Sequence, residues 1–314
     1  METLRLTLRP RSAFGTALKG DTLFGQLCWA LHHRFGDERL KQLLQGYADG
    51  SPFAVMSDAL PEGHLPRPTL PARFFDVPES DRKALKRRVW LPVTALGQPL
   101  SNWLALCVEP AQLLGGKSES HPQPHNSLHR ETNTTGNGFD PYTMEQIWFG
   151  RDTRFEVWVV FDAERISANE LVDCVADIGA SGFGRDASIG LGKLDIDEYA
   201  QLRLPGQPGA NAWLTLGPSA PQGLAWQAEH CFYQPFTRFG RHGDAAVHSG
   251  KPFKTPVLLA DRGAVLRPAI YSDSAFCGRG LGGDGSLSKA MFETVHQGYA
   301  PVVGIKLPNQ GNEV

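Results

Sequence analysis

The sequence lacks the features that mark secreted and membrane proteins. Its cysteines number only five in 314 residues, and no two of them lie two or three positions apart. A scattered, odd-numbered set fits neither a disulfide framework nor a zinc knuckle, so we expect reduced thiols, a cytoplasmic protein and no bound metal or other cofactor. No apolar run reaches membrane-spanning length, and no basic stretch followed by an apolar one occurs in the first residues, so neither a membrane span nor a secretory leader is expected.

An excess of charge of one sign is also missing. The formal net charge is −2 at pH 7, so the total charge gives no indication of a nucleic-acid partner. Residues that interrupt regular structure are abundant instead: the chain has 34 glycines and 23 prolines, while 41% of its residues are hydrophobic. This composition favours a globular protein with many loops and short strands over a helical bundle, and the length favours two domains.

The beginning of the chain predicts one strand and two helices. Residues 4–9 alternate between leucine and polar side chains, which is typical of a half-buried strand, and Pro10 ends it. Apolar residues at helical spacing then predict a helix that Asp21 caps and Gly36 ends. Asp37 is predicted to cap a second helix.

A strand, a helix and a glycine loop follow one another later in the chain. Residues 155–161 alternate as a strand, and Ser167 with Glu170 forms a capping box for a helix that is predicted to end at Gly179. A glycine-rich loop then runs to residue 193, and strand-like residues 194–196 follow it. Between the two structured blocks, residues 114–140 have no periodicity, and a loop of that length is usually functional or disordered.

The second half repeats this theme with shorter elements. Strands are predicted at five places, with a hairpin turn at residues 261–263 between the third and the fourth: Trp213–Leu216, Ala225–Tyr233, Val257–Ala260, Ala264–Leu266 and Val302–Leu307. A second glycine-rich stretch, residues 277–285, precedes a predicted short helix and the last strand. We therefore predict an α+β fold of two ferredoxin-like (RRM-like) βαββαβ modules, residues 1–200 with an inserted loop at about 114–140, and residues 201–314.

The glycine loop around Gly182 is not a nucleotide-binding loop of the usual kind. Phosphate-binding fingerprints follow a strand and open a helix, whereas here a helix precedes the loop and a strand follows it. Two interpretations stay open. Glycines let a ribose-phosphate chain approach main-chain N–H groups, with charged and hydroxyl donors from Arg185, Ser188 and Lys193; otherwise the loop is a surface turn that needs positive φ angles. Asp186 beside Arg185 is expected to hold the loop by a local contact.

Catalytic groups are weakly indicated. His32 and His33 lie on the first predicted helix, and a histidine there is able to serve as a general acid or base, although a surface or helix-edge position is the simpler interpretation. The histidines of residues 121–129 have the spacing of metal ligands on a helix, but the intervening prolines forbid a regular helix. Asp58 is expected in a turn or cap. No nucleophile, base and orienting group come together in the sequence.

Two clusters of positive charge are more suggestive of RNA. One is a predicted cationic helical face in residues 82–88. The other is the segment 238–254, with Arg238, Arg241 and further cations against a single aspartate, and with aromatic residues in residues 232–239 that are suited to stacking on bases. Such clusters are also common on ordinary solvated surfaces.

Several stretches resemble, in the same order, the RAMP-superfamily subunit four of the type III-A CRISPR Csm effector complex (Cas-five group). They are Lys19-Gly-Asp-Thr-Leu-Phe-Gly-Gln-Leu-Cys-Trp-Ala-Leu (19–31), residues 52–61, residues 124–132, the glycine stretch 182–192, and residues 278–283 with His-Gln-Gly-Tyr at 296–299. Together they cover most of the chain. The extra length around residues 119–137 is where the sequence departs from the resemblance.

The resemblance implies a subunit that is not the nuclease. It implies that the chain binds the 5′ tag of a CRISPR RNA (crRNA), contacts the large Cas-ten subunit and the repeating backbone Csm subunits, and lies close to target RNA, in antiviral defence. The candidate RNA-binding residues are Lys19, Arg130, Gly182, Gly184, Arg185, Ser188, Gly190, Lys193, Arg238, Arg241 and Arg279. Two alternatives remain: a metal-independent endoribonuclease that processes CRISPR transcripts with His32 or His33, and a structural adaptor whose main partner is protein.

Overall fold

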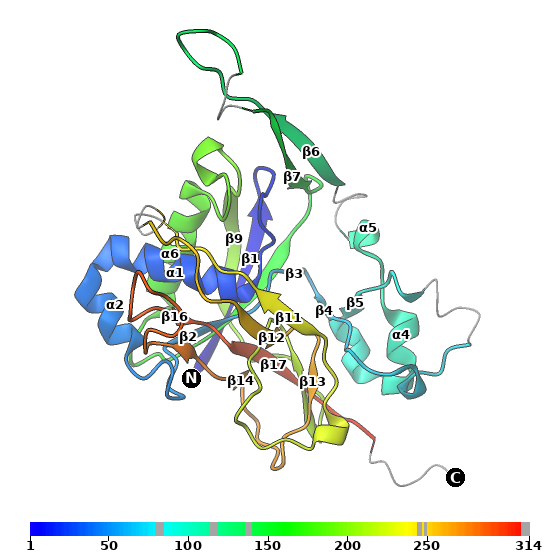
Figure 1. Cartoon of the computed structure of the whole chain (residues 1–314). Helices are drawn as coiled ribbons and strands as arrows, with labels where there is room; N and C mark the ends of the chain where they lie inside the picture. Colours follow the sequence, from blue (N-terminus) through cyan, green and yellow to red (C-terminus); the bar gives the residue numbers. More distant parts are fainter. Residues whose placement is uncertain (79–84, 114–118, 136–139, 244–246, 248–249, 309–314) are drawn as a thin grey trace.

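A five-stranded antiparallel sheet organises the first half of the chain in the computed structural model, which describes residues 1–78, 85–113, 119–135, 140–243, 247 and 250–308 (Figure 1). Four strands lie in the order β2-β8-β1-β9, and the short β3 (Leu60–Pro61) also pairs with β8. Their bounds are Glu2–Pro10 for β1, Ala54–Met56 for β2, Phe155–Phe161 for β8 and Leu194–Gln201 for β9. Together with α1 (Gly20–Phe35) and α6 (Ala168–Ser181), they follow the β-α-β-β-α-β sequence of a ferredoxin-like unit.

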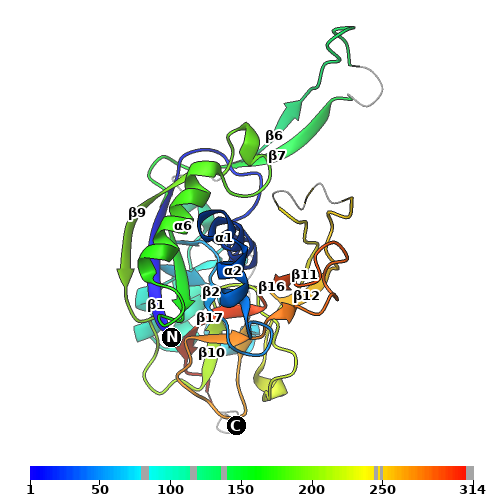
Figure 2. The ribbon, with the colours of Figure 1, turned by 90° about the vertical axis from the view of Figure 1, so that its left-hand side faces the viewer.

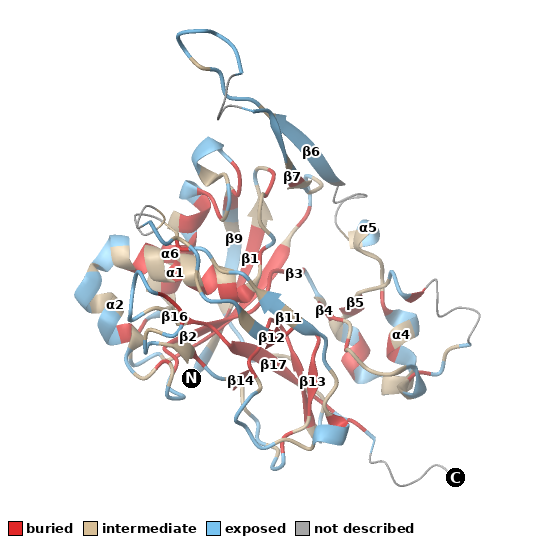
Figure 3. Ribbon diagram, in the orientation of Figure 1, coloured by how far each residue is buried: buried red, intermediate tan, exposed pale blue. Residues whose placement is uncertain are grey.

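Leucines of β1 bury one face of this sheet under the helices. Leu4, Leu6 and Leu8 are buried together with apolar residues of α1 and α6, as their alternation predicts. Figure 2 shows α1 and α6 on one side of the sheet. Every residue of β8 is buried, because β17 of the second half packs on the other side and Trp158 belongs to a second core there (Figure 3).

The helix ends differ from the predicted ones at several positions. Helix α1 begins at Gly20 with Lys19 in the N-cap position, so Asp21 lies in the first turn, and α2 (Asp37–Leu44) begins at Asp37 after Gly36. Neither aspartate is therefore a cap. The end of α1 at Gly36 is confirmed.

Helix α6 keeps its predicted start and passes its predicted end. The capping box of Ser167 and Glu170 is present. The helix continues to Ser181, and Gly182, with φ 102°, is the C-terminal cap instead of Gly179. Gly179 is required for a different reason: a Cβ there would lie 2.2 Å from the carbonyl oxygen of Leu194, so this glycine permits the close approach of α6 to β9.

A long insertion separates β2 from β8. Its described part contains β3, the pair of β4 (His64–Pro66) and β5 (Trp90–Pro92), the short helices α4 (Trp103–Leu106) and α5 (Pro110–Leu113), and several 3-10 turns. It also contains the antiparallel pair of β6 (Glu119–His125) and β7 (Tyr142–Trp148), which projects from the body (Figure 1). The predicted loop at 114–140 is therefore wrong for residues 119–125, since the prolines that exclude a helix are compatible with an edge strand. Residues 114–118 and 136–139 lie outside the described residues.

The basic segment at 82–88 is only partly described. Arg82 and Lys83 of the predicted cationic helix fall in residues 79–84, outside the described residues, and residues 86–87 form a turn. The helical face therefore stays a prediction.

The second half is built from short strands. One sheet has the order β13-β10-β17-β14, and two further pairs are β11-β12 and β15-β16. Their bounds are Ala212–Thr215 (β10), Pro235–Arg238 (β11), Val257–Ala260 (β12), Val265–Leu266 (β13), Phe276–Gly278 (β14), Leu281–Gly282 (β15), Val295–His296 (β16) and Tyr299–Ile305 (β17).

The prediction for this half is confirmed only in part. The strands predicted near β10, β12, β13 and β17 are present, whereas residues 225–233 contain a 3-10 turn at Ala228–His230 in place of a strand. Residues 261–263 do turn the chain, but β12 pairs with β11 and β13 with β10, so they are not a hairpin turn. The short helix predicted after the second glycine stretch is not present in residues 286–308, which the structure describes.

Mixed helix and sheet are confirmed as the fold class, while the pair of ferredoxin-like modules is not. No α-helix occurs between residues 201 and 308 in the part that the structure describes, so the two helices of a second βαββαβ module are missing there. The two halves also share a core: β17 packs against β2 and β8, and the Tyr299 hydroxyl donates to the Tyr47 carbonyl over 2.7 Å. The boundary at residue 200 stays a prediction.

Candidate RNA-binding site

The glycine loop is held by close packing at three of its glycines. Gly182, Gly184 and Gly192 have φ angles of 102°, 78° and 72°. A Cβ at Gly192 would lie 2.1 Å from the Phe183 carbonyl oxygen, and one at Gly184 would lie 2.6 Å from the side chain of Thr16. These three glycines are therefore explained by the backbone path. Gly190, with φ 97°, has no atom within 4 Å of a Cβ position and lies exposed.

Two cations of the loop are bound to the protein itself. The Arg185 guanidinium donates to the Glu145 carbonyl of β7 over 2.9 Å and lies 3.4 Å from the Asp186 carboxylate, which confirms the local contact expected of that pair. Lys193 donates from its Nζ atom to the Ala180 carbonyl at the end of α6. Both side chains therefore hold the loop against β7 and α6, and both remain at least partly exposed to solvent.

The exposed bend of the loop leaves main-chain donors open. The N–H groups of Gly184, Asp186, Ala187 and Ser188 make no hydrogen bond within the described part of the chain, whereas that of Arg185 donates to Thr16 Oγ1 over 2.9 Å. Ser188 is exposed, and its hydroxyl has no partner there. This bend offers N–H and O–H donors to an oxygen-rich ligand.

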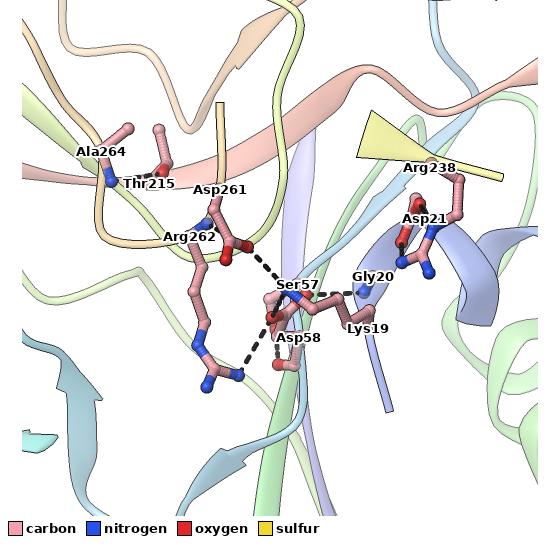
Figure 4. Close-up of polar contacts among 10 residues, drawn as sticks. All are labelled: Lys19, Gly20, Asp21, Ser57, Asp58, Thr215, Arg238, Asp261, Arg262 and Ala264. Atoms are coloured by element: carbon pink, nitrogen blue, oxygen red, sulfur yellow. Dashed lines mark hydrogen bonds and ion pairs between the residues drawn. The ribbon is translucent and has the colours of Figure 1, made fainter. Parts of the chain in front are cut away.

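A second group of predicted residues lies where α1, β2 and the second half meet (Figure 4). Lys19 Nζ lies 2.5 Å from Asp261 Oδ1 and 3.9 Å from Asp58 Oδ2, and 4.4 Å from the centre of the Phe236 ring. Arg262 Nη1 lies 3.2 Å from Asp58 Oδ2. Cations from two separate segments therefore lie beside one buried carboxylate, Asp58, which also accepts from the Gly20 N–H over 2.8 Å.

The neighbouring pair of Arg238 and Asp21 is bidentate. Arg238 donates from Nε and Nη2 to the two oxygens of Asp21 over 2.6 and 2.8 Å, and His296 Nε2 lies 3.4 Å from Asp21 Oδ2. Arg238 also lies over the Phe236 ring at 4.8 Å, on which Lys19 packs as well. Two residues predicted to bind RNA, Lys19 and Arg238, thus lie close together, but each forms an ion pair with an aspartate.

Burial and pairing move the pKa values of the two aspartates in opposite directions. Burial alone would raise the pKa of Asp21, but the neighbouring His296 ring and the hydrogen bonds from Arg238 outweigh it and hold that pKa well below its usual range. Burial raises the pKa of Asp58, because the charges of Arg262 and Lys19 and the Gly20 N–H compensate for it only in part. The sequence interpretation missed this cluster; the family-like segment 52–61 pointed to Asp58, but no local signal shows its distant partners.

The remaining predicted cations are exposed and lie apart. Arg130 follows β6, Arg279 lies between β14 and β15, and Arg241 lies beyond β11. None of these guanidinium groups makes a hydrogen bond or an ion pair within the described residues, although Arg241 lies 5.8 Å from the Phe253 ring centre. They are available to a ligand.

The histidines considered for catalysis have structural neighbours. His32 Nδ1 lies 3.0 Å from Asp37 Oδ1, and its ring packs with those of Trp29 and His33. His125 stacks on Tyr142 at 5.2 Å in the β6–β7 hairpin. Among the described residues, no group of three histidine, cysteine or acidic side chains is placed to hold a metal ion, and no helix is long and apolar enough to cross a membrane.

Solved structures of CRISPR-Cas complexes contain the same fold. A chain of the Csm3-Csm4 subcomplex in the type III-A CRISPR-Cas interference complex matches with a TM-score of 0.63 and 13% identity, over 98% of this chain and 100% of that one. Two Csm1-Csm4 cassette structures, with cA4 and with pppApA, give TM-scores of 0.61 and 0.59 at 16% and 15% identity, over 98% of this chain and 100% and 99% of theirs. No protein-family model and no curated protein matches the sequence.

The fold is therefore that of a subunit found in type III-A CRISPR-Cas complexes. Csm4 is the component that the matched structures have in common, and the predicted resemblance to subunit four of the Csm assembly is confirmed in the fold.

Proposed function

We propose that this chain is a non-catalytic subunit of a type III-A CRISPR effector complex that binds the 5′ tag of the crRNA. In this role it joins the large Cas-ten subunit to the backbone Csm subunits and lies close to target RNA. The observation that carries the proposal is the fold, which is shared over 98% of the chain with structures whose components are Csm1, Csm3 and Csm4.

Two surface features support contact with RNA. The bend of the glycine loop presents the N–H groups of Gly184, Asp186, Ala187 and Ser188 without partners in the described part, and main-chain donors of this kind bind phosphate oxygens without regard to base. Arg130, Arg241 and Arg279 have guanidinium groups that no described carboxylate neutralises. A chain with a formal net charge of −2 thus still offers positive sites locally.

A processing endoribonuclease is the second candidate, and one observation favours it. The imidazole of His32 is held by Asp37 at 3.0 Å, which is how a general acid or base is often oriented. The two functions differ in what happens to the RNA, so one experiment separates them.

That experiment incubates the purified full chain with labelled RNA containing a CRISPR repeat in the presence of a chelator. Gel analysis then measures binding and cleavage together. We expect a shifted complex and intact RNA. Specific cleavage that a His32→Ala/His33→Ala double variant abolishes would replace the proposal with a processing nuclease.

The contribution of the glycine loop is tested with Arg185→Ala. We expect weaker binding and a salt dependence of log affinity that is shallower by about 0.7, the change for one phosphate contact on a single strand. Arg203→Ala is the matched control, because it removes the same charge from an exposed position just beyond the other end of β9. Unchanged affinity at every salt concentration, with the thermal melting of the variant also unchanged, would remove Arg185 from the site.

The partner roles are tested by co-purification. Tagged chain expressed with Csm1-type and Csm3-type subunits and a crRNA should recover both subunits. Recovery of the subunits in the absence of crRNA, together with no RNA binding by the chain alone, would favour the adaptor that depends on protein contacts.

A further inference from the structure

Two described arms, residues 239–243 and 250–254, continue the β11–β12 ribbon beyond its two strands; we call them the irregular hairpin. The Lys254 N–H donates to the Gly240 carbonyl and the His242 N–H to the Pro252 carbonyl, each over 2.8 Å, and Arg241 is the cross-strand partner of Phe253. Figure 2 shows this segment extending from the ribbon on the side of α1. The two described arms, residues 239–243 and 250–254, are therefore held in register with each other.

One side of this hairpin packs on the protein. His242 is buried, and its Nε2 atom lies 2.8 Å from Ser288 Oγ. Gly243, at the end of the first arm, also approaches α1, since a Cβ there would lie 3.2 Å from Trp29 Nε1. Lys254 is half-buried, and burial lowers its pKa. The hairpin is thus fixed to the body through its inner side.

The other side carries two aromatic rings and one cation. Phe239 is 76% exposed and Phe253 is 71% exposed. Because side chains alternate along an extended chain, Phe239 and Arg241 point to the same side, and the cross-strand partner Phe253 shares it. The Arg241 guanidinium lies 5.8 Å from the Phe253 ring centre. We call Phe239, Arg241 and Phe253 the aromatic face.

The composition of this face indicates what covers it. Both rings lie mostly in water, so they contribute little to the core of the isolated chain. The arms contain the exposed cations Arg241 and Lys251 and no acidic residue, and the Arg241 charge has no ion-pair partner in the described part. Flat apolar rings beside cations without counter-charges match a single-stranded nucleic acid, whose bases stack on aromatic side chains while its phosphates attract cations.

We propose that the aromatic face stacks bases of single-stranded RNA, with Phe239 and Phe253 as the stacking residues and Arg241 as a phosphate or cation–π contact. This inference rests on the proposed function, because it names the part of the surface that holds the bases. It also separates two neighbouring arginines: Arg241 faces the ligand, whereas Arg238 points inward to Asp21.

The test compares the full chain and its variants on two probes, a labelled single-stranded RNA and the same ribose-phosphate chain with abasic sites. Phe239→Ala and Phe253→Ala should each weaken binding of the normal RNA by about 5- to 100-fold, the range for loss of one base–aromatic stack. Phe253→Trp should bind the normal RNA about as tightly as the wild type, because tryptophan also stacks on bases. On the abasic probe, the alanine variants and the wild type should bind equally, because no base is present to stack.

The control is Tyr199→Ala, which removes an exposed aromatic ring from β9, a strand of the other sheet. Both phenylalanines are exposed, so their alanine variants leave no cavity and should melt at the wild-type temperature. If the wild type binds RNA and the alanine variants bind both probes as well as it does, the aromatic face is not the site while the proposed function stands. If the variants keep RNA binding and lose a Csm subunit on co-purification, the face docks a protein and the inference is overturned. If the wild type binds neither probe, both proposals fail.

Discussion

Removal of the Arg238 guanidinium should show whether this residue serves the fold or the RNA. In Arg238→Ala, the buried carboxylate of Asp21 loses both of its guanidinium hydrogen bonds, of 2.6 and 2.8 Å. The His296 ring, whose Nε2 atom lies 3.4 Å from Asp21 Oδ2, then remains beside the carboxylate. A buried charge that loses its partner costs more than the pair itself contributes, because desolvation is no longer compensated.

The magnitude follows from burial and from what remains. Breaking a buried pair by removing one partner typically costs 3–5 kcal/mol. Arg238 is 23% exposed and Asp21 is 0% exposed at their side chains, so water reaches the vacated site only from one side. With His296 still in place, we expect the free energy of unfolding at pH 7 to fall by about 3 kcal/mol, the lower end of that range.

The pH dependence gives a second, sharper signature. In the wild type the pKa of Asp21 lies below its usual value, so the stabilisation is complete above the unfolded pKa of about 3.9 and is lost as the pH falls through the folded value. Without Arg238, burial becomes the dominant influence and raises that pKa. The variant should therefore lose stability as the pH rises above about 4, and its deficit relative to the wild type should grow steadily from acid pH to neutrality.

Urea unfolding of both proteins at several pH values measures these quantities. Arg241→Ala is the matched control, because it removes a nearby guanidinium that has no ion pair in the described part, and its stability should stay within about 0.5 kcal/mol of the wild type. A double-mutant cycle with Asp21→Asn should give a coupling of more than 1 kcal/mol, as expected for residues in one network. An Arg238→Ala protein within 1 kcal/mol of the wild type at pH 7 would refute the reasoning and return Arg238 to the candidate RNA ligands.

Two further predictions concern the glycine loop and the second buried aspartate. Gly192→Ala should lower the free energy of unfolding in urea by more than about 3 kcal/mol, because the φ of Gly192 is 72° and a Cβ would lie 2.1 Å from the Phe183 carbonyl oxygen. Gly190→Ala, with φ 97° and open space around the Cβ position, should lower it by only about 1–2 kcal/mol, and equal losses in the two variants would contradict the packing argument. Asp58→Asn should become more stable relative to the wild type as the pH rises from about 4, because burial raises the folded pKa of Asp58 and ionisation of this carboxyl then destabilises the wild type. A stability difference that does not change with pH would show that Asp58 has the same pKa in the folded and the unfolded chain.

Features set by neighbouring residues could be predicted from the sequence. The alternation of residues 4–9 gave β1 and its buried leucines, and Ser167 with Glu170 gave the start of α6, because both patterns act within a few residues. Glycines in residues 182–192 correctly indicated positive φ angles. The pairing of Arg185 with Asp186 was likewise a local contact.

Roles set by distant residues were assigned wrongly or missed. Asp21 has the local features of a helix cap, yet its partner Arg238 lies 217 positions away, and the pair buries it. Gly179 has the sequence context of a helix end, yet α6 continues past it to Ser181. A glycine is needed there because it permits the close approach of α6 to Leu194. The second ferredoxin-like module was predicted from a repeated order of strands and glycines, and the helices that it needs are not found in the described residues of that half.

By itself, the sequence determined β1, the start of α6, the positive φ angles of the glycine loop and, through several short stretches in order, the resemblance to the fold that the solved structures share. Only the tertiary structure decided which charged side chains are neutralised and which are open. Periodicity and capping are short-range interactions, so neighbouring residues are enough to specify them. The state of an ionic group depends on burial and on partners from other segments. Two arginines three positions apart differ for this reason: Arg238 reaches a buried carboxylate, whereas Arg241, among the described residues, contacts the Phe253 ring and no carboxylate.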